Sequence, residues 1–274
     1  LGTLETPILL TNTLNVGLVA DALIEHMLEA NPDIGVTTGT INPVVGECND
    51  SFLNDIRGRH VKPEHVRQAL RTATDGQLEE GAVGAGTGMS AFELKGGIGS
   101  SSRIVPSQHG GYVVGSLVLS NFGRLTDLII DGVPVGRDLC EHMAPKSSAN
   151  GSIIILIATN APVSSRQLRR MAKRATHGLA RTGSVSTHGS GDIVIAFSTT
   201  SRVPHYREDI RTPVGSVFEE DLTWLFRATA EATEEAILNS LFKAETMVGR
   251  DGNTRMALPL DQARTILQKC RRIQ

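Results

Sequence analysis

The feature of this sequence with the most chemical promise is a hydroxyl at the junction of two unlike segments. Residues 141–151 (EHMAPKSSANG) are small, polar and aperiodic, residues 153–159 (IIILIAT) are apolar, and Ser152 joins them. Its Oγ can attack the carbonyl of Gly151 through a five-membered ring, and hydrolysis of the resulting ester leaves Ser152 as a new N-terminus. The α-amine, with an ordinary pKa of about 7.7–8.0, then lies beside the hydroxyl as a general base.

The same dipeptide also has an ordinary interpretation. Gly-Ser in a polar linker is most often a turn. In favour of chemistry, Gly151 has no Cβ, so its carbonyl can be approached closely and can adopt conformations closed to other residues. The dipeptide alone favours the turn, and the choice depends on the rest of the chain.

A second hydroxyl lies in the sequence HGSGD at residues 188–192, directly before the apolar run IVIAF. Flanking glycines would let the Ser190 hydroxyl project from the start of a strand, with the Asp192 carboxylate two residues further on. The alternative is a glycine turn with an Asx cap. The pattern is not the GxSxG nucleophile elbow.

Two further polar positions have both a structural and a functional interpretation. Glu47 belongs to the cluster ECND, which is ordinarily a solvated turn with a helix cap. Asn121 ends an apolar run before Phe122-Gly123 and is either a turn residue or an amide donor directed at a site. The glycine-rich loop at residues 84–88 lacks the Lys-Ser/Thr of a phosphate-binding loop, which argues against a nucleotide site.

Composition limits the class of protein. The 274 residues are 40% hydrophobic, enough for a full-size core. With 27 basic and 29 acidic residues, a formal charge of -2 and no basic block, the chain lacks the electrostatic footprint of nucleic-acid binding. The longest apolar run, residues 153–158, is far shorter than the roughly 20 residues that span a bilayer. We therefore expect no nucleic-acid partner and no membrane insertion.

The cysteines indicate the redox environment. Cys48, Cys140 and Cys270 lie far apart, without the spacing of a disulfide framework or a zinc site. We expect a reducing compartment, the cytoplasm, and neither a metal nor another cofactor. The chain starts at Leu1 without a Met, so a preceding segment could carry a signal peptide.

Hydrophobic periodicity predicts the elements that must position these groups. Apolar residues at spacings of three and four favour helices, and runs rich in β-branched residues favour strands. The helices expected cover residues 15–30, 63–74, 162–179, 222–244 and 259–269. The strands expected cover residues 7–11, 98–105, 111–120, 125–133, 153–159 and 192–198. This alternation predicts a layered α/β (α+β) fold in one domain over residues 1–274.

Five blocks of the sequence carry a family resemblance when they are taken together. In chain order they are PVVGECNDSFLND (43–55), GAVGAGTGMSAFELKGGIGSSSR (81–103), VGSLVLSNFG (114–123), NGSIIILIATNAPVSSRQLRRMAKRA (150–175) and HGSGDIVIAFST (188–199). They resemble the L-aminopeptidase/D-esterase family, which includes the β-peptidyl aminopeptidases. The resemblance implies a four-layer α/β/β/α sandwich similar to N-terminal-nucleophile hydrolases. It also implies autocleavage before a serine, here into residues 1–151 and 152–274.

The resemblance gives a role to each polar position. Ser152 would be the nucleophile, Asn121 would donate to the oxyanion, and Ser190 and Asp192 would orient or polarise the nucleophile. Glu47 falls where the family has a carboxylate that binds the free amino group of the substrate. The implied function is a self-processing serine aminopeptidase that acts on small peptides or on amino-acid amides or esters through an acyl-enzyme on Ser152. The family also suggests a homotetramer.

Departures from the family pattern leave some properties open. Some members have Tyr, a candidate second oxyanion donor, where this chain has Asn49, and some have Glu where it has Asp192. D-esterase activity and β-peptide preference are therefore open, and family members begin well before Leu1. Ornithine acetyltransferases share a related fold and self-cleave before a Thr, so Ser152 favours hydrolysis over that acyltransferase alternative. A non-catalytic assembly protein would not need the full polar set.

Overall fold

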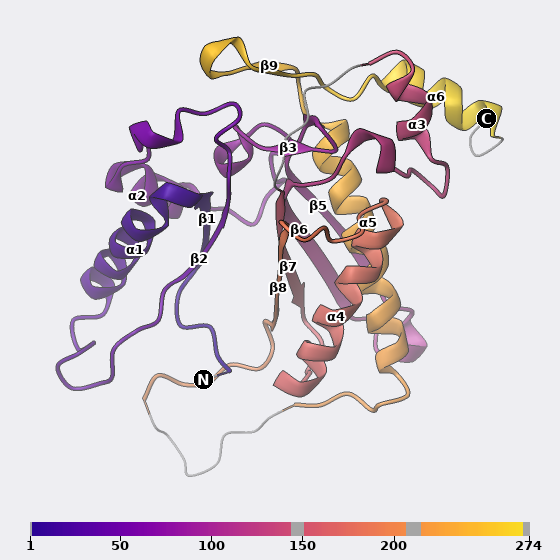
Figure 1. Cartoon of the computed structure of the whole chain (residues 1–274). Coiled ribbons are helices and arrows are strands. Elements are labelled where there is room, and N and C mark those ends of the chain that lie inside the picture. The colour runs from indigo at the N-terminus through magenta and orange to yellow at the C-terminus, as the bar shows by residue number, and fades with distance from the viewer. Residues whose placement is uncertain (1, 144–150, 207–214, 271–274) are drawn as a thin grey trace.

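The structure is a computed structural model that describes residues 2–143, 151–206 and 215–270 (Figure 1). Of the polar connector expected over residues 141–151, residues 144–150 lie outside the described part. Ser152 and the strand that begins with it lie within that part.

The first two layers come from the N-terminal part of the chain. Two helices pack on a parallel sheet of two strands. The elements are β1 (Ile8–Asn12), α1 (Val16–Ala30), β2 (Val44–Cys48) and α2 (Pro63–Thr72). Val19 and Ala22 of α1 and Val66 of α2 form a small core with Leu9 and Val45 of the strands. The apolar stripes that predicted both helices therefore face this sheet and each other.

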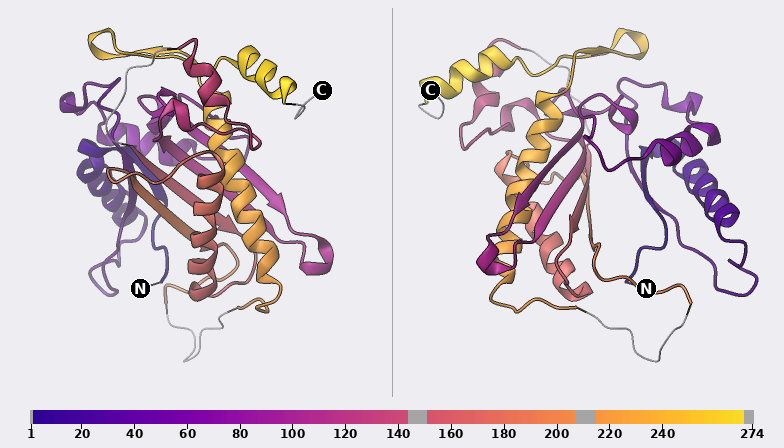
Figure 2. Two further views of the ribbon diagram at one scale, coloured as in Figure 1. Left: turned by 45° about the vertical axis from the view of Figure 1, so that its right-hand side comes forward. Right: turned by 180° about the vertical axis from the view of Figure 1, so that it is seen from behind.

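The second sheet has four strands in the order β5-β6-β7-β8. They are β5 (Gly97–Ile104), β6 (Val113–Asn121), β7 (Ser152–Thr159) and β8 (Gly191–Ser198). Neighbours are antiparallel except for β7 and β8, which are parallel. Helices α4 (Ser165–Arg181) and α5 (Leu222–Phe242) cover one face of it (Figure 2). The largest apolar core lies there, with Ile153 and Ile155 of β7 against Met171 and Ile237 of the helices.

The other face of the four-stranded sheet packs against the first sheet. Cys48 of β2 joins Leu119 and Ile154 of the second sheet in a buried cluster. The sheets approach closely, because a Cβ on Gly46 would lie 3.2 Å from the Ile154 side chain. The layers therefore follow one another as helix, sheet, sheet and helix (Figure 1). The layered α/β fold predicted from the sequence is confirmed.

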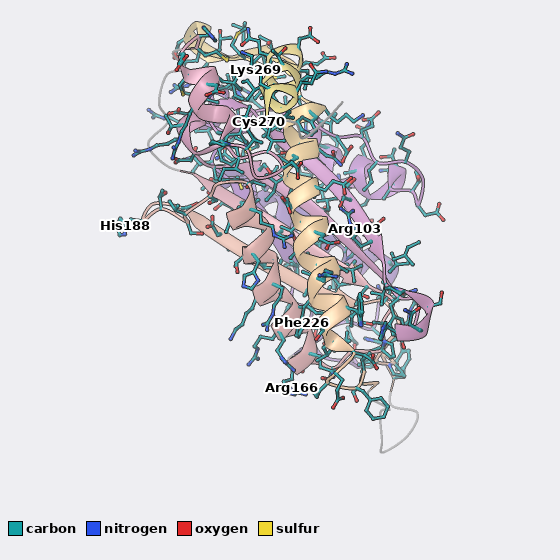
Figure 3. All side chains as sticks on the ribbon, turned by 90° about the vertical axis from the view of Figure 1, so that its right-hand side faces the viewer. Arg103, Arg166, His188, Phe226, Lys269 and Cys270 are labelled. Atoms are coloured by element: carbon teal, nitrogen blue, oxygen red, sulfur yellow. The ribbon has the colours of Figure 1, made fainter. Side chains whose placement is uncertain are left out.

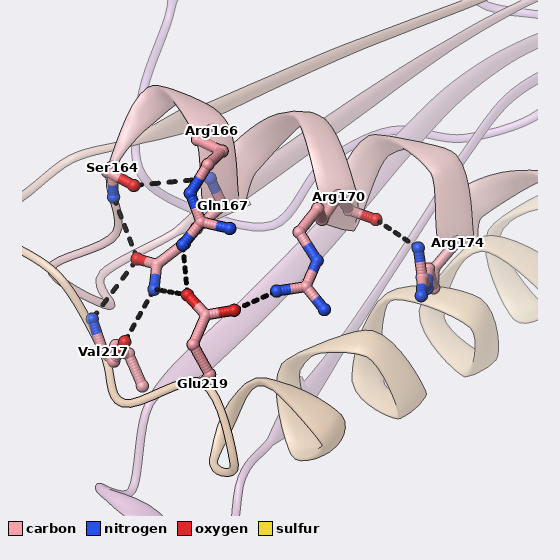
Figure 4. Close-up of polar contacts among 7 residues, drawn as sticks. All are labelled: Ser164, Arg166, Gln167, Arg170, Arg174, Val217 and Glu219. Atoms are coloured by element: carbon pink, nitrogen blue, oxygen red, sulfur yellow. Dashed lines mark hydrogen bonds and ion pairs between the residues drawn. The ribbon is translucent and has the colours of Figure 1, made fainter.

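A capping box and an ion cluster fix the start of α4 (Figure 4). Ser164 accepts a hydrogen bond from the Gln167 N–H, and the Gln167 side chain accepts one from the Ser164 N–H. Glu219, which precedes α5, pairs with Arg166 and Arg170 of α4. Hydrogen bonding from Arg166 lowers the pKa of the Glu219 carboxyl. These contacts tie the start of α4 to the segment that leads into α5.

Shorter elements complete the described chain. They are β3 (Ser90–Ala91), β4 (Leu94–Lys95), α3 (Val135–Cys140), β9 (Met247–Val248), β10 (Thr254–Arg255) and α6 (Leu260–Lys269). Strands β3 and β4 form a small hairpin, as do β9 and β10. Within the described ranges, no helix has the length and apolar character needed to cross a membrane.

The strand expected over residues 125–133 is wrong. This segment contains a 3-10 turn and then a single bridge between Ile130 and Val133. Asp131 and Gly132, between them, have φ angles of 48° and 75°. Two left-handed residues in succession make a tight turn, which Asp-Gly favours. The apolar residues of the segment indicated burial, and the Asp-Gly pair prevents them from forming one strand.

Candidate active site

Ser152 is the first residue of β7 and lies between two neighbouring strand ends. Its pairing partners are Asn121, the last residue of β6, and Gly191, the first residue of β8. A Cβ on Gly191 would lie 4.0 Å from Ser152 Oγ. Cross-strand partners project to the same face of a sheet. Ser152 and Asn121 therefore share the face of Leu119 and Ile154, which is the face turned to the first sheet.

Gly151 occupies a position where only glycine fits. A Cβ on it would lie 2.7 Å from Phe122 Cα and 3.0 Å from the Asn121 carbonyl oxygen. Glycine is required here because neighbouring main-chain atoms lie too close for a Cβ, and not because of backbone conformation, since Gly151 does not have a left-handed φ. Its own carbonyl oxygen accepts a hydrogen bond of 3.2 Å from the Gly191 N–H. The carbonyl that Ser152 would attack is thus held by a backbone donor.

Asn121 is buried, and its amide group has a defined orientation. Its Oδ1 accepts a hydrogen bond of 2.9 Å from the Ser90 N–H, and its Nδ2 donates one of 3.0 Å to the Asn49 carbonyl. Because Ser90 N–H can only donate and the Asn49 carbonyl can only accept, the oxygen and nitrogen cannot be exchanged. An amide has two protons, so Nδ2 can donate one to Asn49 and one to an oxyanion.

Asn49, which replaces the Tyr of some family members, contributes through its main chain. Its carbonyl accepts the hydrogen bond from Asn121, while its side-chain Oδ1 accepts one of 3.0 Å from the Ser51 N–H. The Asn49 side chain therefore caps a local turn, and its carbonyl holds the candidate oxyanion donor.

Ser190 and Asp192 form a hydrogen-bonded pair at the start of β8. The Ser190 hydroxyl donates to Asp192 Oδ1 at 2.6 Å. Asp192 Oδ2 is buried and has no hydrogen-bond partner among the described residues. Asp192 pairs with Ile153, whose side chain lies in the core under the helices. The Asp192 carboxylate and the Ser152 hydroxyl thus start from opposite faces of the sheet, at the same strand end.

Glu47 approaches from the first sheet. It is the penultimate residue of β2 and pairs with Thr11. Its carboxylate accepts a hydrogen bond from the Thr13 hydroxyl. Alternation along β2 puts Glu47 on the side of Val45, which packs on α1, whereas Cys48 faces the second sheet. Glu47 is therefore the neighbour of Cys48, which contacts Ser152, but its own side chain lies on the far face of β2 from Ser152.

Cys48 contacts the candidate nucleophile, which the sequence analysis did not predict. Burial raises the pKa of its thiol to about 12, and the carboxylates of Glu47 and Asp192 act in the same direction. Hydrogen bonds from the Ser152 side chain and the Ile154 backbone oppose this shift. Cys48 is therefore a neutral thiol packed against Ser152. Cys48 lies next to Glu47 in the block ECND, and this position on a strand is the sequence signal that could have placed Cys48 near the site.

Two other features of the sequence contribute no side chain to this cluster. His188 is exposed in the segment that precedes β8 (Figure 3). The glycine-rich loop folds as a 3-10 turn at Gly84–Gly86, and its Gly86 carbonyl is bound by Lys95. Among the described residues, no three His, Cys, Asp or Glu side chains are grouped as ligands for a metal ion.

Comparison with known proteins identifies relatives over most of the chain. The model of peptidase family S58 matches residues 1–255. A beta-peptidyl aminopeptidase BapA from Sphingosinicella microcystinivorans is 40% identical over 286 residues, covering 99% of this chain and 71% of the relative. The protein of that name from Sphingosinicella xenopeptidilytica is 38% identical over 275 residues, covering 96% of this chain and 68% of the relative.

Solved structures show the same similarity in three dimensions. The PH0078 protein from Pyrococcus horikoshii OT3 is 55% identical with a TM-score of 0.93, covering 99% of this chain and 74% of that one. A beta-aminopeptidase from Burkholderia sp. is 39% identical with a TM-score of 0.90, and coverage is 97% and 74%. The L-aminopeptidase D-ala-esterase/amidase from Ochrobactrum anthropi, described as a prototype serine aminopeptidase with a variant Ntn hydrolase fold, is 35% identical with a TM-score of 0.87, and coverage is 97% and 74%.

Proposed function

Because the chain belongs to peptidase family S58 and is a serine aminopeptidase with an N-terminal-nucleophile hydrolase fold, we propose that its nucleophile is Ser152, created by self-cleavage after Gly151. The observation that carries this proposal is the meeting of three strand ends. Ser152 lies between Asn121 and Gly191, and the Gly191 N–H holds the carbonyl of Gly151. A hydroxyl, a bound carbonyl and an amide donor are thus collected at one point.

Self-cleavage would proceed as an N-to-O acyl shift. The Ser152 Oγ attacks the Gly151 carbonyl carbon, its proton passes to the Ser152 nitrogen, and the C–N bond breaks to leave an ester. Negative charge that develops on the Gly151 oxygen is stabilised by the Gly191 N–H already bound to it. Water then hydrolyses the ester, which gives a carboxylate on Gly151 and a free amine on Ser152.

Turnover would reuse the same groups on a peptide substrate. The Ser152 amine removes the proton from its own hydroxyl, which attacks the substrate carbonyl and forms an acyl-enzyme. Asn121 Nδ2 donates to the oxyanion. The buried Asp192 Oδ2, which lacks a partner among the described residues, accepts from the ammonium, and Ser190 fixes the orientation of the carboxylate. The Ser152 nitrogen belongs to the main chain and lies in the plane of the sheet. The Asp192 carboxylate can therefore accept a hydrogen bond from it, although the Ser152 hydroxyl projects from the opposite face.

The substrates we propose are small peptides and amino-acid amides or esters with a free amino group. Two relatives carry the name β-peptidyl aminopeptidase, and a third is an L-aminopeptidase D-ala-esterase/amidase. Glu47 would pair with the substrate ammonium at the end of β2, which requires its carboxylate to turn from the Thr13 hydroxyl toward the strand ends. These relatives do not favour the acyltransferase alternative. We also propose a homotetramer, which light scattering on the purified protein would test.

One preparation of the protein tests the proposal. Intact-mass measurement should find two chains, residues 1–151 and 152–274, and Ser152→Ala should leave one chain with no turnover. The cut protein should hydrolyse amino-acid p-nitroanilides and reject their N-acetylated forms. A wild-type chain that stays whole after long incubation would contradict the nucleophile assignment, and equal rates on free and acetylated substrates would contradict the role of Glu47.

A further inference from the structure

A fully buried lysine lies behind the candidate oxyanion donor. Lys95, the last residue of β4, has 0% of its surface exposed. Its Nζ donates hydrogen bonds to three main-chain carbonyls, those of Gly86 at 2.8 Å, Met89 at 3.0 Å and Gly96 at 2.6 Å. Three acceptors match the three protons of an ammonium, since a neutral amine has only two. Burial opposes the charge and lowers the pKa of Lys95 to about 7.

One peptide unit connects this ammonium to Asn121. The carbonyl of the peptide bond between Met89 and Ser90 accepts the hydrogen bond from Lys95, and the N–H of the same peptide donates to Asn121 Oδ1. A carbonyl bound by a cation polarises its peptide and makes the N–H a stronger donor. The next amide in the chain of hydrogen bonds is that of Asn121, whose Nδ2 protons become stronger donors in turn.

A second buried cation supports the same residue from the other side. Arg255 of β10 is 1% exposed, and its Nε donates to the Ser90 hydroxyl at 3.0 Å. Its guanidinium lies 3.6 Å from the centroid of the Phe52 ring. Ser90 is therefore held by Lys95 through its peptide and by Arg255 through its side chain.

The hairpin that carries these contacts is strained. Phe92 and Glu93, the turn between β3 and β4, have φ angles of 51° and 61°, a conformation that costs non-glycine residues energy. Its strands pair Ser90 with Lys95. Strain retained at a site is consistent with a functional demand on the geometry, and here it keeps Ser90 and Lys95 opposite one another.

We propose that Lys95 is a positioning residue for catalysis, whose ammonium orients and polarises the Asn121 amide through the Met89–Ser90 peptide, with Arg255 bracing Ser90. This inference rests on the proposed role of Asn121 as oxyanion donor. The positive charge is fixed at the far end of the hydrogen-bond chain that ends at the Asn121 amide, and it needs no rearrangement during the reaction. The hydrogen bonds of Lys95 go to main-chain carbonyls, so it would act through Asn121.

A double-mutant cycle tests whether Lys95 acts through Asn121. Lys95→Met, Asn121→Ala and the double variant are compared with wild type on an amino-acid p-nitroanilide below pH 7, using protein shown by mass to be cut after Gly151. Lys95→Met should lower kcat by roughly tenfold or more with KM within about twofold. In the Asn121→Ala background the same change should alter kcat by less than about twofold. Lys173→Met, on the exposed face of α4, is the matched control.

The possible outcomes distinguish the role of Lys95 from the role of Asn121. Equal losses of kcat from Lys95→Met in both backgrounds, or an effect on KM alone, would overturn the inference and leave the role of Asn121 intact. Wild-type kcat in Asn121→Ala would instead contradict the proposed function at that residue. Thermal unfolding of each variant shows whether the hairpin is retained.

A measurement on the wild-type protein covers the case in which Lys95→Met does not fold. In protein labelled with ¹⁵N at Lys and Asn, the Asn121 side-chain signal should shift with the same midpoint as Lys95, while the remote Asn239 amide stays constant. The charged groups beside Lys95 in this hairpin are Arg255 of β10, whose guanidinium contacts the Ser90 hydroxyl and the Glu93 carbonyl, and Glu93 in the turn itself. A constant Asn121 signal while Lys95 titrates would overturn the inference.

Discussion

At the scale of single residues, the site depends on where strands begin and end. Ser152, Asn121 and Gly191 are terminal residues of three adjacent strands, and register alone makes them neighbours. Gly151 and Gly191 add a hydrogen bond that ordinary parallel pairing provides. The proposed chemistry therefore uses main-chain groups that the sheet has already positioned, in a chain that is rich in glycine and poor in aromatic residues.

Gly151→Ala should slow self-cleavage by roughly 10²-fold, because its Cβ would lie 2.7 Å from Phe122 Cα and force the carbonyl away from the Gly191 N–H. The rate is measured from the appearance of the two fragments by mass spectrometry. Gly115→Ala in β6 is the matched control, since its nearest contact would be 3.9 Å and processing should be normal. Normal processing of Gly151→Ala would show that the close fit is not required.

Substitutions of Asn121 and of the Ser190–Asp192 pair should have different effects on the kinetics of the cleaved enzyme. Asn121→Ala should lower kcat by roughly 10²–10³ with little change in KM, because it donates to charge present only in the transition state. Ser190→Ala and Asp192→Asn should each be severe, and the double variant scarcely worse, because the two share one hydrogen bond. Steady-state kinetics measures kcat and KM for each variant. If the losses of activation free energy from the two single substitutions add in the double variant, Ser190 and Asp192 act independently.

At the scale of elements, the β3–β4 hairpin contains a buried lysine, Lys95, whose titration should affect the stability of the fold. Burial lowers the pKa of Lys95 from 10.5 to about 7. Between these values the unfolded chain binds a proton that the folded chain has released, so the free energy of unfolding rises with pH. The contribution of this group is at most about 1.4 kcal/mol per pH unit. Below pH 7 both states hold the proton, and the contribution is constant.

Denaturant unfolding from pH 7 to 10 should show this slope in the Ser152→Ala background, where the chain stays uncut. Adding Lys95→Met should remove it, and adding Lys173→Met, at an exposed position, should not. If all three proteins have the same dependence on pH, Lys95 does not titrate in this window.

Elements with a plain hydrophobic pattern were predictable from sequence, and those set by turns or buried charges were not. The Ile-rich run of β7 and the stripe of α4 lie where periodicity put them. Residues 125–133 had the composition of a strand, yet the Asp131-Gly132 turn divides them. Lys95 sits in the motif FELKGG, and nothing in its neighbours indicates that three carbonyls lie within reach of its ammonium.

The site followed the same rule. The residues Ser152, Asn121, Ser190 and Asp192 were predicted from five sequence blocks, and the structure brings them to one end of the sheet. Their division between two faces depends on register, which sequence blocks do not contain. Cys48 was missed for that reason, because its contact with Ser152 exists only between sheets.

At the scale of the whole molecule, the proposed cut falls inside one sheet. Strands β5 and β6 belong to residues 1–151, while β7 and β8 belong to residues 152–274, and β6 pairs with β7 over eight positions. Helix α5 of the second fragment also packs on β5 and β6 of the first. A break at this point would leave the largest core of the protein shared between two chains.

The two fragments should therefore stay together after cleavage. Size-exclusion chromatography under native conditions should give one peak that contains both, and only denaturant should separate them. Refolding from isolated fragments should be slow and dependent on concentration, since neither has a complete sheet. Separate native peaks would contradict the shared core.

The position of β7 also bears on a hazard peculiar to this class of enzyme. An aminopeptidase that cleaves its own chain creates a new N-terminus, which other molecules of the same enzyme could digest. Here that N-terminus would be the start of β7. It is flanked by β6 and β8, and Ile153 and Ile155 behind it are fully buried. Removal of this terminus by another molecule would require a central, buried strand to separate from its sheet, and such an opening is costly. After the proposed cut, the sheet would thereby protect Ser152 from removal by other molecules of the same enzyme.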